Sequence, residues 1–462
     1  MPLSPARRIA FDVLLRVHTA DAFAGDLLHS SLGPRIRRED AALCTELTYG
    51  CLRWQRLLDT ILTPRVRKPL DAMDLEVVLA LRMGLYQLRF LDRIPPSAAV
   101  NESVQLARRA GRASAAGLVN AVLRGLADGA KLPADSFVPA DASLATRLGL
   151  THSHPDWLVS RWLRNFGEHR TRALLASNNA PAAVACAVHT DSGSPEDIQT
   201  VISELASDIC QVNSGRWLKH SLRLRSGNVS RSAAFRQGRI HIQDEASQMV
   251  PLLLDARPGE SVLELCAGQG GKTLQLLAHT RECSIISADL HWRNLAALRR
   301  RAAWRPASAA SSLELVALDA ARPLPFSRKF QKILVDAPCS GTGTLARNPE
   351  IRWRLSETQL SGQPDRQLAI LRQAARCLAP GGRLVYATCS LEPEENEELI
   401  GHFLHLDSGF RTVHPGSALA PHLLEDASPE QLISHDGAFR TFPPESLTDG
   451  FFAVALEQPS RR

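Results

Sequence analysis

The first 130 residues carry apolar side chains at the three- and four-residue spacing of amphipathic helices. Ser4-Pro5 supplies a helix N-cap and a first-turn proline, which favours a helix start at this point. The pattern predicts an all-α bundle. Its apolar positions are Ile9, Val13, Leu14 and Val17, then Leu43, Leu47, Leu57, Leu58 and Ile61, then Leu75, Val78, Leu79, Leu85 and Leu88, and finally Val100, Val104 and Leu106.

The middle of the chain has a weaker pattern. Leu132–Asp141 contains proline and aspartate and is typical of a linker. Trp157–Ala176 again has helical spacing. Between Ala183 and Val229, short apolar runs alternate with glycine and serine, and we expect a small α+β module there.

From about Pro258, short apolar runs alternate with helical stretches. Such alternation predicts a Rossmann-like α/β domain with a doubly wound, mostly parallel sheet, whose ligands bind beyond the carboxyl ends of the strands. Each run ends at a Cys, Asp or Thr residue or is followed directly by one. The runs are Ser261–Cys266, Ser284–Asp289, Leu313–Leu318, Lys332–Asp336 and Arg383–Thr388.

These patterns divide the 462 residues into three expected domains, 1–135, 142–235 and 236–462. Arg7 and Arg8 lead into a stretch that lacks the apolar core of a signal peptide, and no apolar run approaches the roughly 20 residues of a membrane span. We therefore expect a cytosolic protein. Nine cysteines, an odd number without zinc-ligand spacing, indicate neither a disulfide framework nor a metal site.

The net charge of +6 is compatible with nucleic acid but does not demonstrate it. Residues 1–140 hold 19 Lys and Arg against 14 Asp and Glu, whereas the remainder is nearly balanced. The basic excess therefore lies in the helical N-terminal part, where a solvated helix surface is the alternative explanation.

A glycine-rich turn, Glu264-Leu-Cys-Ala-Gly-Gln-Gly-Gly-Lys-Thr273, follows the first predicted strand. Glycines let such a turn adopt positive φ and approach a ligand closely. Two other nucleotide-binding motifs each fail by one residue. A phosphate-binding P-loop needs glycine where Cys266 stands, and the dinucleotide fingerprint needs glycine where Thr273 stands.

Acidic residues at successive strand ends favour an adenosyl ligand. Asp289 lies 25 residues after Glu264, where a carboxylate can accept hydrogen bonds from both ribose hydroxyls. Asp319 follows the third predicted strand and could accept from an adenine amino group.

Two cysteines lie at neighbouring strand ends, in Asp336-Ala-Pro-Cys-Ser-Gly341 and Ala387-Thr-Cys-Ser390. C5 of cytosine is too electron-poor to attack a methyl sulfonium, but a thiolate that adds to C6 makes C5 enamine-like. Methylation then needs an acidic group at N3 or the N4 amino group, a base for the C5 proton, and an unstacked nucleotide. Asp336, Cys339 and Cys389 meet these needs, although spacing alone does not say which cysteine is the nucleophile.

These motifs resemble those of the Nop/Sun (Fmu) family of RNA cytosine-5 methyltransferases, and residues 1–135 resemble the NusB-like domain of its bacterial 16S rRNA members. Gly268-Gln269 and Asn294 stand where that family commonly has Ala-Pro and Arg. Further matching segments extend the resemblance over nearly the whole chain. They are Leu47–Arg53, Asn120–Arg124, Ser153–Trp157, Ile242–Ser247, Val262–Thr273, Arg347–Trp353, Pro393–Asn396 and Thr448–Phe452.

The resemblance implies methylation of C5 of one cytosine in 16S rRNA, with S-adenosylmethionine as cofactor, RNA as partner and no metal. It implies that Cys389 is the nucleophile, that Cys339 assists product release and that Asp336 holds the base. A monomer is the default. The residues expected to contact the cofactor are Cys266, Ala267, Gly268, Gln269, Gly270, Gly271, Lys272, Asp289, Asp319 and Asp336, with a structural loop cation as the alternative for Lys272.

Two alternatives stay open at this point. The same chemistry could act on tRNA or on another rRNA site, because the NusB-like domain favours 16S rRNA only by analogy. A non-catalytic ribosome-assembly factor that still binds the cofactor is the alternative from a different class. The intact Asp336, Cys339 and Cys389 argue against it.

Overall fold

The computed structural model describes residues 3–20, 22–33, 35–189, 195–207, 210–280, 282–303 and 311–459. It divides into two compact units. The first is Met1–Pro181 together with Leu345–Leu355, and the second is Ala182–Thr344 together with Ser356–Arg462. Among the described residues, none of the helices combines the length and the apolar character that a membrane crossing requires.

The first unit is an all-α bundle, which confirms the prediction from apolar spacing. Its first helix begins at Pro5, where the Ser4 side chain accepts a hydrogen bond from the Arg7 N–H. Val13 and Leu14 are almost fully buried in the core. The helices are α1 (Pro5–Thr19), α2 (Ala24–Ser31), α3 (Arg38–Arg53), α4 (Gln55–Leu62), α5 (Leu75–Phe90), α6 (Pro96–Arg109), α7 (Ala116–Leu126), α8 (Leu144–Thr151), α9 (Asp156–Asn179) and α15 (Ile351–Arg354).

Helix α9 confirms the helical spacing of Trp157–Ala176 and contains one interruption. Gly167 has a non-helical backbone there, with φ 74° and ψ 172°. Only glycine adopts this left-handed backbone without a steric penalty, so the single glycine of the segment marks the break.

The segment Leu345–Leu355 belongs to the first unit although the chain on both sides of it belongs to the second. Arg352 is fully buried and donates hydrogen bonds to the carbonyls of Ser153 (3.2 Å) and Asn178 (3.1 Å). The indole N–H of Trp353 donates to the carbonyl of Leu52 at 2.6 Å. This segment, which we call the strap, therefore completes the hydrogen bonding of helices that lie far from it in the sequence.

The second unit starts with the predicted α+β module. Its four-stranded antiparallel sheet has the order β2-β3-β1-β4. Val201 and Leu205 of one helix pack with Cys186 and Leu222 of the sheet. The elements are β1 (Val184–Val188), α10 (Pro195–Ser207), β2 (Gln211–Ser214), β3 (Ser221–Ser226), α11 (Ala233–Arg236) and β4 (Ile240–Ile242).

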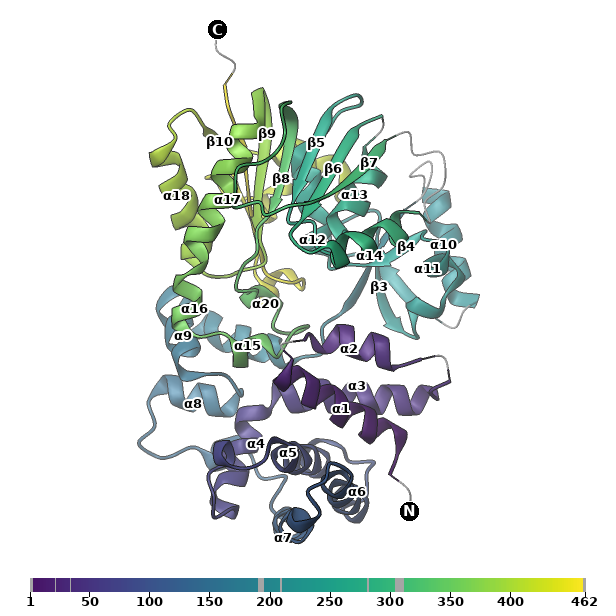
Figure 1. Ribbon diagram of the computed structural model, residues 1–462, viewed down its shortest axis with the longest axis vertical. Helices are drawn as coiled ribbons and strands as arrows, with labels where there is room; N and C mark the ends of the chain where they lie inside the picture. Colours follow the sequence, from purple (N-terminus) through teal and green to yellow (C-terminus); the bar gives the residue numbers. More distant parts are fainter. Residues whose placement is uncertain are drawn as a thin grey trace. The chain divides into compact units, whose positions relative to one another are not determined.

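The larger sheet confirms the Rossmann-like fold. Its strands have the order β10-β12-β9-β8-β5-β6-β7, and the neighbours from β9 to β7 are parallel (Figure 1). Leu265 at the end of β5 pairs with Val335, and Asp336 pairs with Ala387, so three strand ends lie side by side. The parallel strands are β5 (Ser261–Leu265), β6 (Ser284–Asp289), β7 (Ser312–Ala317), β8 (Phe330–Asp336) and β9 (Leu378–Thr388).

Antiparallel strands extend this sheet beyond the five predicted runs. β12 (Phe451–Glu457) pairs with β9, while β10 (Arg411–Val413) and β11 (Ala438–Thr441) pair with β12. The remaining helices of the second unit are α12 (Glu245–Met249), α13 (Gly271–His279), α14 (Trp292–Ala302), α16 (Glu357–Ser361), α17 (Gln363–Cys377), α18 (Glu397–Leu406), α19 (Gly416–Leu419) and α20 (Pro443–Ser446).

Candidate active site

The two cysteines of the strand-end motifs lie in contact. Cys339 follows β8 and Cys389 follows β9, and these strands are parallel neighbours. Their sulfur atoms are 3.3 Å apart, and both side chains are partly exposed. Contact with Cys389, followed by burial, raises the pKa of the Cys339 thiol well above its usual value. The neutral thiol is therefore the favoured form of Cys339.

An ion pair lies at the end of the strand next to these cysteines. Lys272 Nζ is 2.6 Å from Asp336 Oδ2 and 5.1 Å from the centre of the Phe451 ring. Lys272 belongs to the first turn of α13 and is 7% exposed, whereas Asp336 ends β8. The structure thus pairs Lys272 with the carboxylate expected to hold the base.

The glycine-rich turn has an alternating left-handed backbone. Cys266, Gly268 and Gly270 have φ values of 61°, 54° and 84°. A Cβ on Gly268 would meet nothing within 4 Å, so the turn is open on that side. From α14, Arg301 donates a 2.7 Å hydrogen bond to the Gln269 carbonyl, which restrains the turn where the resembling family commonly has proline.

Asp289 anchors the same turn. Its carboxylate accepts hydrogen bonds from the Gly268 N–H (2.9 Å), the His291 N–H (2.8 Å) and the Asn294 amide (3.0 Å). A carboxylate has about four lone-pair sites, so Asp289 can still accept from a ligand. Asp319 accepts from the Ala321 N–H at 3.0 Å and is more exposed.

Two buried carboxylates of the second unit are not among the site residues expected from the sequence. Glu264 is fully buried and accepts from Thr273 (2.5 Å) and Ser287 (2.6 Å), and burial raises its pKa to about 7. It lies within the core, unlike the more exposed Asp319. Glu395 is also fully buried and contacts residues of both cysteine loops. In the sequence it is marked by its position shortly after the second cysteine motif and by its place in the family-like segment Pro393–Asn396.

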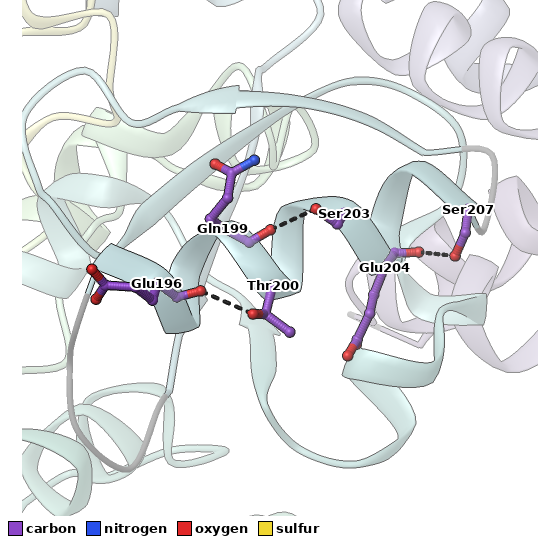
Figure 2. Close-up of a pocket in the computed structure, with 6 residues that line it drawn as sticks. All are labelled: Glu196, Gln199, Thr200, Ser203, Glu204 and Ser207. Atoms are coloured by element: carbon purple, nitrogen blue, oxygen red, sulfur yellow. Dashed lines mark hydrogen bonds between the residues drawn. The ribbon is translucent and has the colours of Figure 1, made fainter.

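A separate hollow of about 560 Å³ lies along α10 (Figure 2). All six lining residues come from this one helix. The hydroxyls of Thr200, Ser203 and Ser207 donate to carbonyls of their own helix, as the dashed lines in Figure 2 show. Because these hydroxyls already donate hydrogen bonds within α10, the residues at the ends of β8 and β9, Asp336, Cys339 and Cys389, are the better candidate for chemistry.

Models of known families match most of the chain. A model described as 16S rRNA methyltransferase RsmB/F matches residues 251–457, and a NusB-family model matches residues 4–128. Residues 154–230 match a ferredoxin-like domain of RsmF/B-like methyltransferases. The three matches follow one another in the order of the all-α, α+β and Rossmann-like parts.

Curated relatives match over the full length. The chain is 30% identical to a probable ribosomal RNA small subunit methyltransferase B of Bacillus subtilis, over 99% of this chain and 100% of that protein. It is 32% identical to the ribosomal RNA small subunit methyltransferase B of Pseudomonas putida, over 93% and 94%. Among solved structures, the crystal structure of PH0851 aligns with a TM-score of 0.79 at 25% identity, over 99% of each chain.

Proposed function

The chain belongs to the RsmB/F family of 16S rRNA methyltransferases, and from this premise we propose that it methylates C5 of one cytosine in 16S rRNA. The observation that carries the proposal is the 3.3 Å contact of Cys339 and Cys389 beside the pair of Asp336 and Lys272. A mechanism in which a cysteine only attacks the base needs one thiol. A mechanism in which a second cysteine assists release of the product needs two thiols close together, as seen here.

S-adenosylmethionine fits the left-handed turn after β5 and would supply the methyl group. The open side of Gly268 gives a ligand room, Asp289 ends β6, and Asp319 follows β7. These carboxylates match the ribose hydroxyls and the adenine amino group of an adenosyl ligand. Cys266–Gly271 would contact the ligand through their backbone, while Asp336 would hold the reacting base.

In the proposed reaction, the Cys389 thiolate forms a bond to C6 of the cytosine, and the electron pair of the C5–C6 double bond becomes available at C5. Asp336 holds the base through N3 or the N4 amino group, and Lys272 keeps the Asp336 carboxylate in place. After C5 has gained the methyl group, a base removes the C5 proton. The electrons of that C–H bond restore the double bond and expel Cys389 as thiolate, to which the Cys339 thiol donates a hydrogen bond.

The first unit is proposed to bind the RNA. A NusB-family model matches residues 4–128, and residues 1–140 carry an excess of basic side chains. Cationic side chains bind phosphates with little regard to sequence, so this unit would supply affinity while the second unit selects the base.

The test is to incubate the protein with labelled S-adenosylmethionine and 16S rRNA that lacks the modification, then to map 5-methylcytosine by sequencing. We expect one modified cytosine with the wild type and none with Cys389→Ser, while Cys377→Ser, a buried cysteine before β9, keeps activity. Methylation of another RNA would change the target and keep the chemistry. No methylation by protein that binds both the cofactor and RNA would favour an assembly factor.

A further inference from the structure

Glu395 links the two cysteine loops. Its Oε1 accepts hydrogen bonds from the Ser340 N–H (2.8 Å) and the Gln367 amide (2.9 Å). Its Oε2 accepts from the Ser340 hydroxyl (2.5 Å) and from the Ser390 hydroxyl, and the two hydroxyl oxygens are 3.0 Å apart. One carboxylate therefore contacts the residue that immediately follows each cysteine.

Burial of a carboxylate costs free energy unless its oxygens accept hydrogen bonds. Glu395 is 0% exposed, and burial raises the pKa of its carboxyl group. A buried carboxylate is tolerated when donors surround it, and here four donors do so. Hydrogen bonds of the Gly343 N–H to the Cys389 carbonyl (3.0 Å) and of the Leu391 N–H to Thr342 (3.0 Å) also join the loops. The side chain of Glu395 differs from these contacts in that it bonds to the residue after each cysteine, Ser340 and Ser390.

We propose that Glu395 is a positioning residue that sets the separation of the two thiols and thereby controls release of the methylated RNA. This inference rests on the proposed function. Glu395 makes its hydrogen bonds to Ser340 and Ser390 and not to the thiols, so it takes no part in bond formation. Without Glu395, Ser340 and Ser390 would lose these hydrogen bonds, and the loops that carry Cys339 and Cys389 would be held less firmly.

Product release is the step most sensitive to a change in the separation of the two thiols. Addition to C6 needs Cys389 and the base, whereas release also needs the Cys339 thiol close to the departing sulfur. A displacement of about 1 Å can cost about 100-fold in rate. Loss of the Glu395 contacts should therefore leave RNA covalently attached to the protein.

Two substitutions separate position from charge. Glu395→Gln keeps the length of the side chain and removes its charge. Glu395→Asp keeps the charge and withdraws the oxygens by one methylene group. If Glu395 acts by position, Glu395→Asp is the more damaging change. If it acts through its negative charge near Cys339, Glu395→Gln is the more damaging one.

The experiment measures multiple-turnover methylation of the mapped rRNA and, on denaturing gels, the fraction of protein attached to RNA. We expect Glu395→Asp to lower turnover by about 100-fold and to accumulate the adduct, and Glu395→Gln to be at least about tenfold more active than Glu395→Asp. Glu398→Gln, an exposed neighbour on α18, is the matched control. Thermal denaturation and cofactor binding verify folding.

The double variant Ser340→Ala/Ser390→Ala keeps Glu395 and removes both hydroxyl anchors, so it tests the same contacts should Glu395→Asp fold poorly. It should also accumulate the adduct. Turnover of the double variant at the wild-type level without adduct, or Glu395→Gln less active than a folded Glu395→Asp, would overturn the inference. A wild type that methylates no cytosine would instead overturn the proposed function.

Discussion

Replacing Gly270 by alanine should destabilise the second unit and weaken cofactor binding. Gly270 has φ 84°, and this left-handed backbone costs a residue with a Cβ about 1–2 kcal/mol. The added Cβ would lie 2.2 Å from Leu298 Cδ1, 2.8 Å from Cγ and 3.1 Å from its Cβ. Leu298 is fully buried and meets the new atom along most of its length, so a rotation of its tip does not relieve the contact.

Overpacking of this kind adds about 1–3 kcal/mol, so the free energy of unfolding should fall by about 2–5 kcal/mol in total. Gly259 is a matched control, because it has the same φ of 84° and a Cβ there would meet nothing within 4 Å. Gly259→Ala should therefore show the backbone cost alone. Urea denaturation gives the stability, and titration with S-adenosylmethionine gives the affinity.

The reasoning would be refuted if Gly270→Ala cost no more stability than Gly259→Ala. A second check comes from the neighbour. Adding Leu298→Ala to Gly270→Ala removes the colliding atoms, so the double variant should be more stable than the sum of the two single effects implies. Strict additivity would mean that the two side chains do not collide.

Three further outcomes are expected. Cys339→Ala should accumulate RNA-bound protein during turnover, because the thiol that assists release is missing; a denaturing gel without adduct, with RNA binding intact, would contradict that role. Arg352→Met should destabilise the first unit by about 2–6 kcal/mol, since the buried carbonyls of Ser153 and Asn178 lose their donor at about 1–3 kcal/mol each, and an unchanged melting temperature would contradict this. Burial raises the pKa of Glu264 from 4.5 to about 7, so the folded protein retains a proton that the unfolded chain loses as the pH rises from 4.5 to 7. Its stability relative to Glu264→Gln should fall by about 3 kcal/mol over this window in denaturation curves, and parallel curves would contradict the burial argument.

The fold class could be predicted because each part has a periodicity of its own. Leu14 and Val17 recur at helical spacing and are buried in a helical core, and the runs Ser261–Cys266 and Lys332–Asp336 became β5 and β8. The antiparallel β12 was not predicted, although Phe451–Glu457 is apolar and almost wholly buried. No helical stretch alternates with it, and its pairing with β9 depends on the finished sheet.

The candidate site also has a part that could be predicted from the sequence and a part that could not. The rule that parallel strands present their carboxyl ends at one edge was enough to expect Asp336, Cys339 and Cys389 together, and the structure brings them to that edge. What each of them does is our proposal. The Glu395 contacts could not be predicted, because a carboxylate that contacts two loops is visible only once the loops are paired.

The strap has a consequence for the order in which the protein matures on the ribosome. Residues 182–344, 163 in number, separate the last helix of Met1–Pro181 from the strap. At about 5–20 residues per second, their synthesis takes roughly 8–33 s. During that interval the carbonyls of Ser153 and Asn178 lack the buried guanidinium of Arg352 that they bind in the finished molecule. The part of the protein that is made first therefore reaches its final packing only after much of the methyltransferase part has been translated.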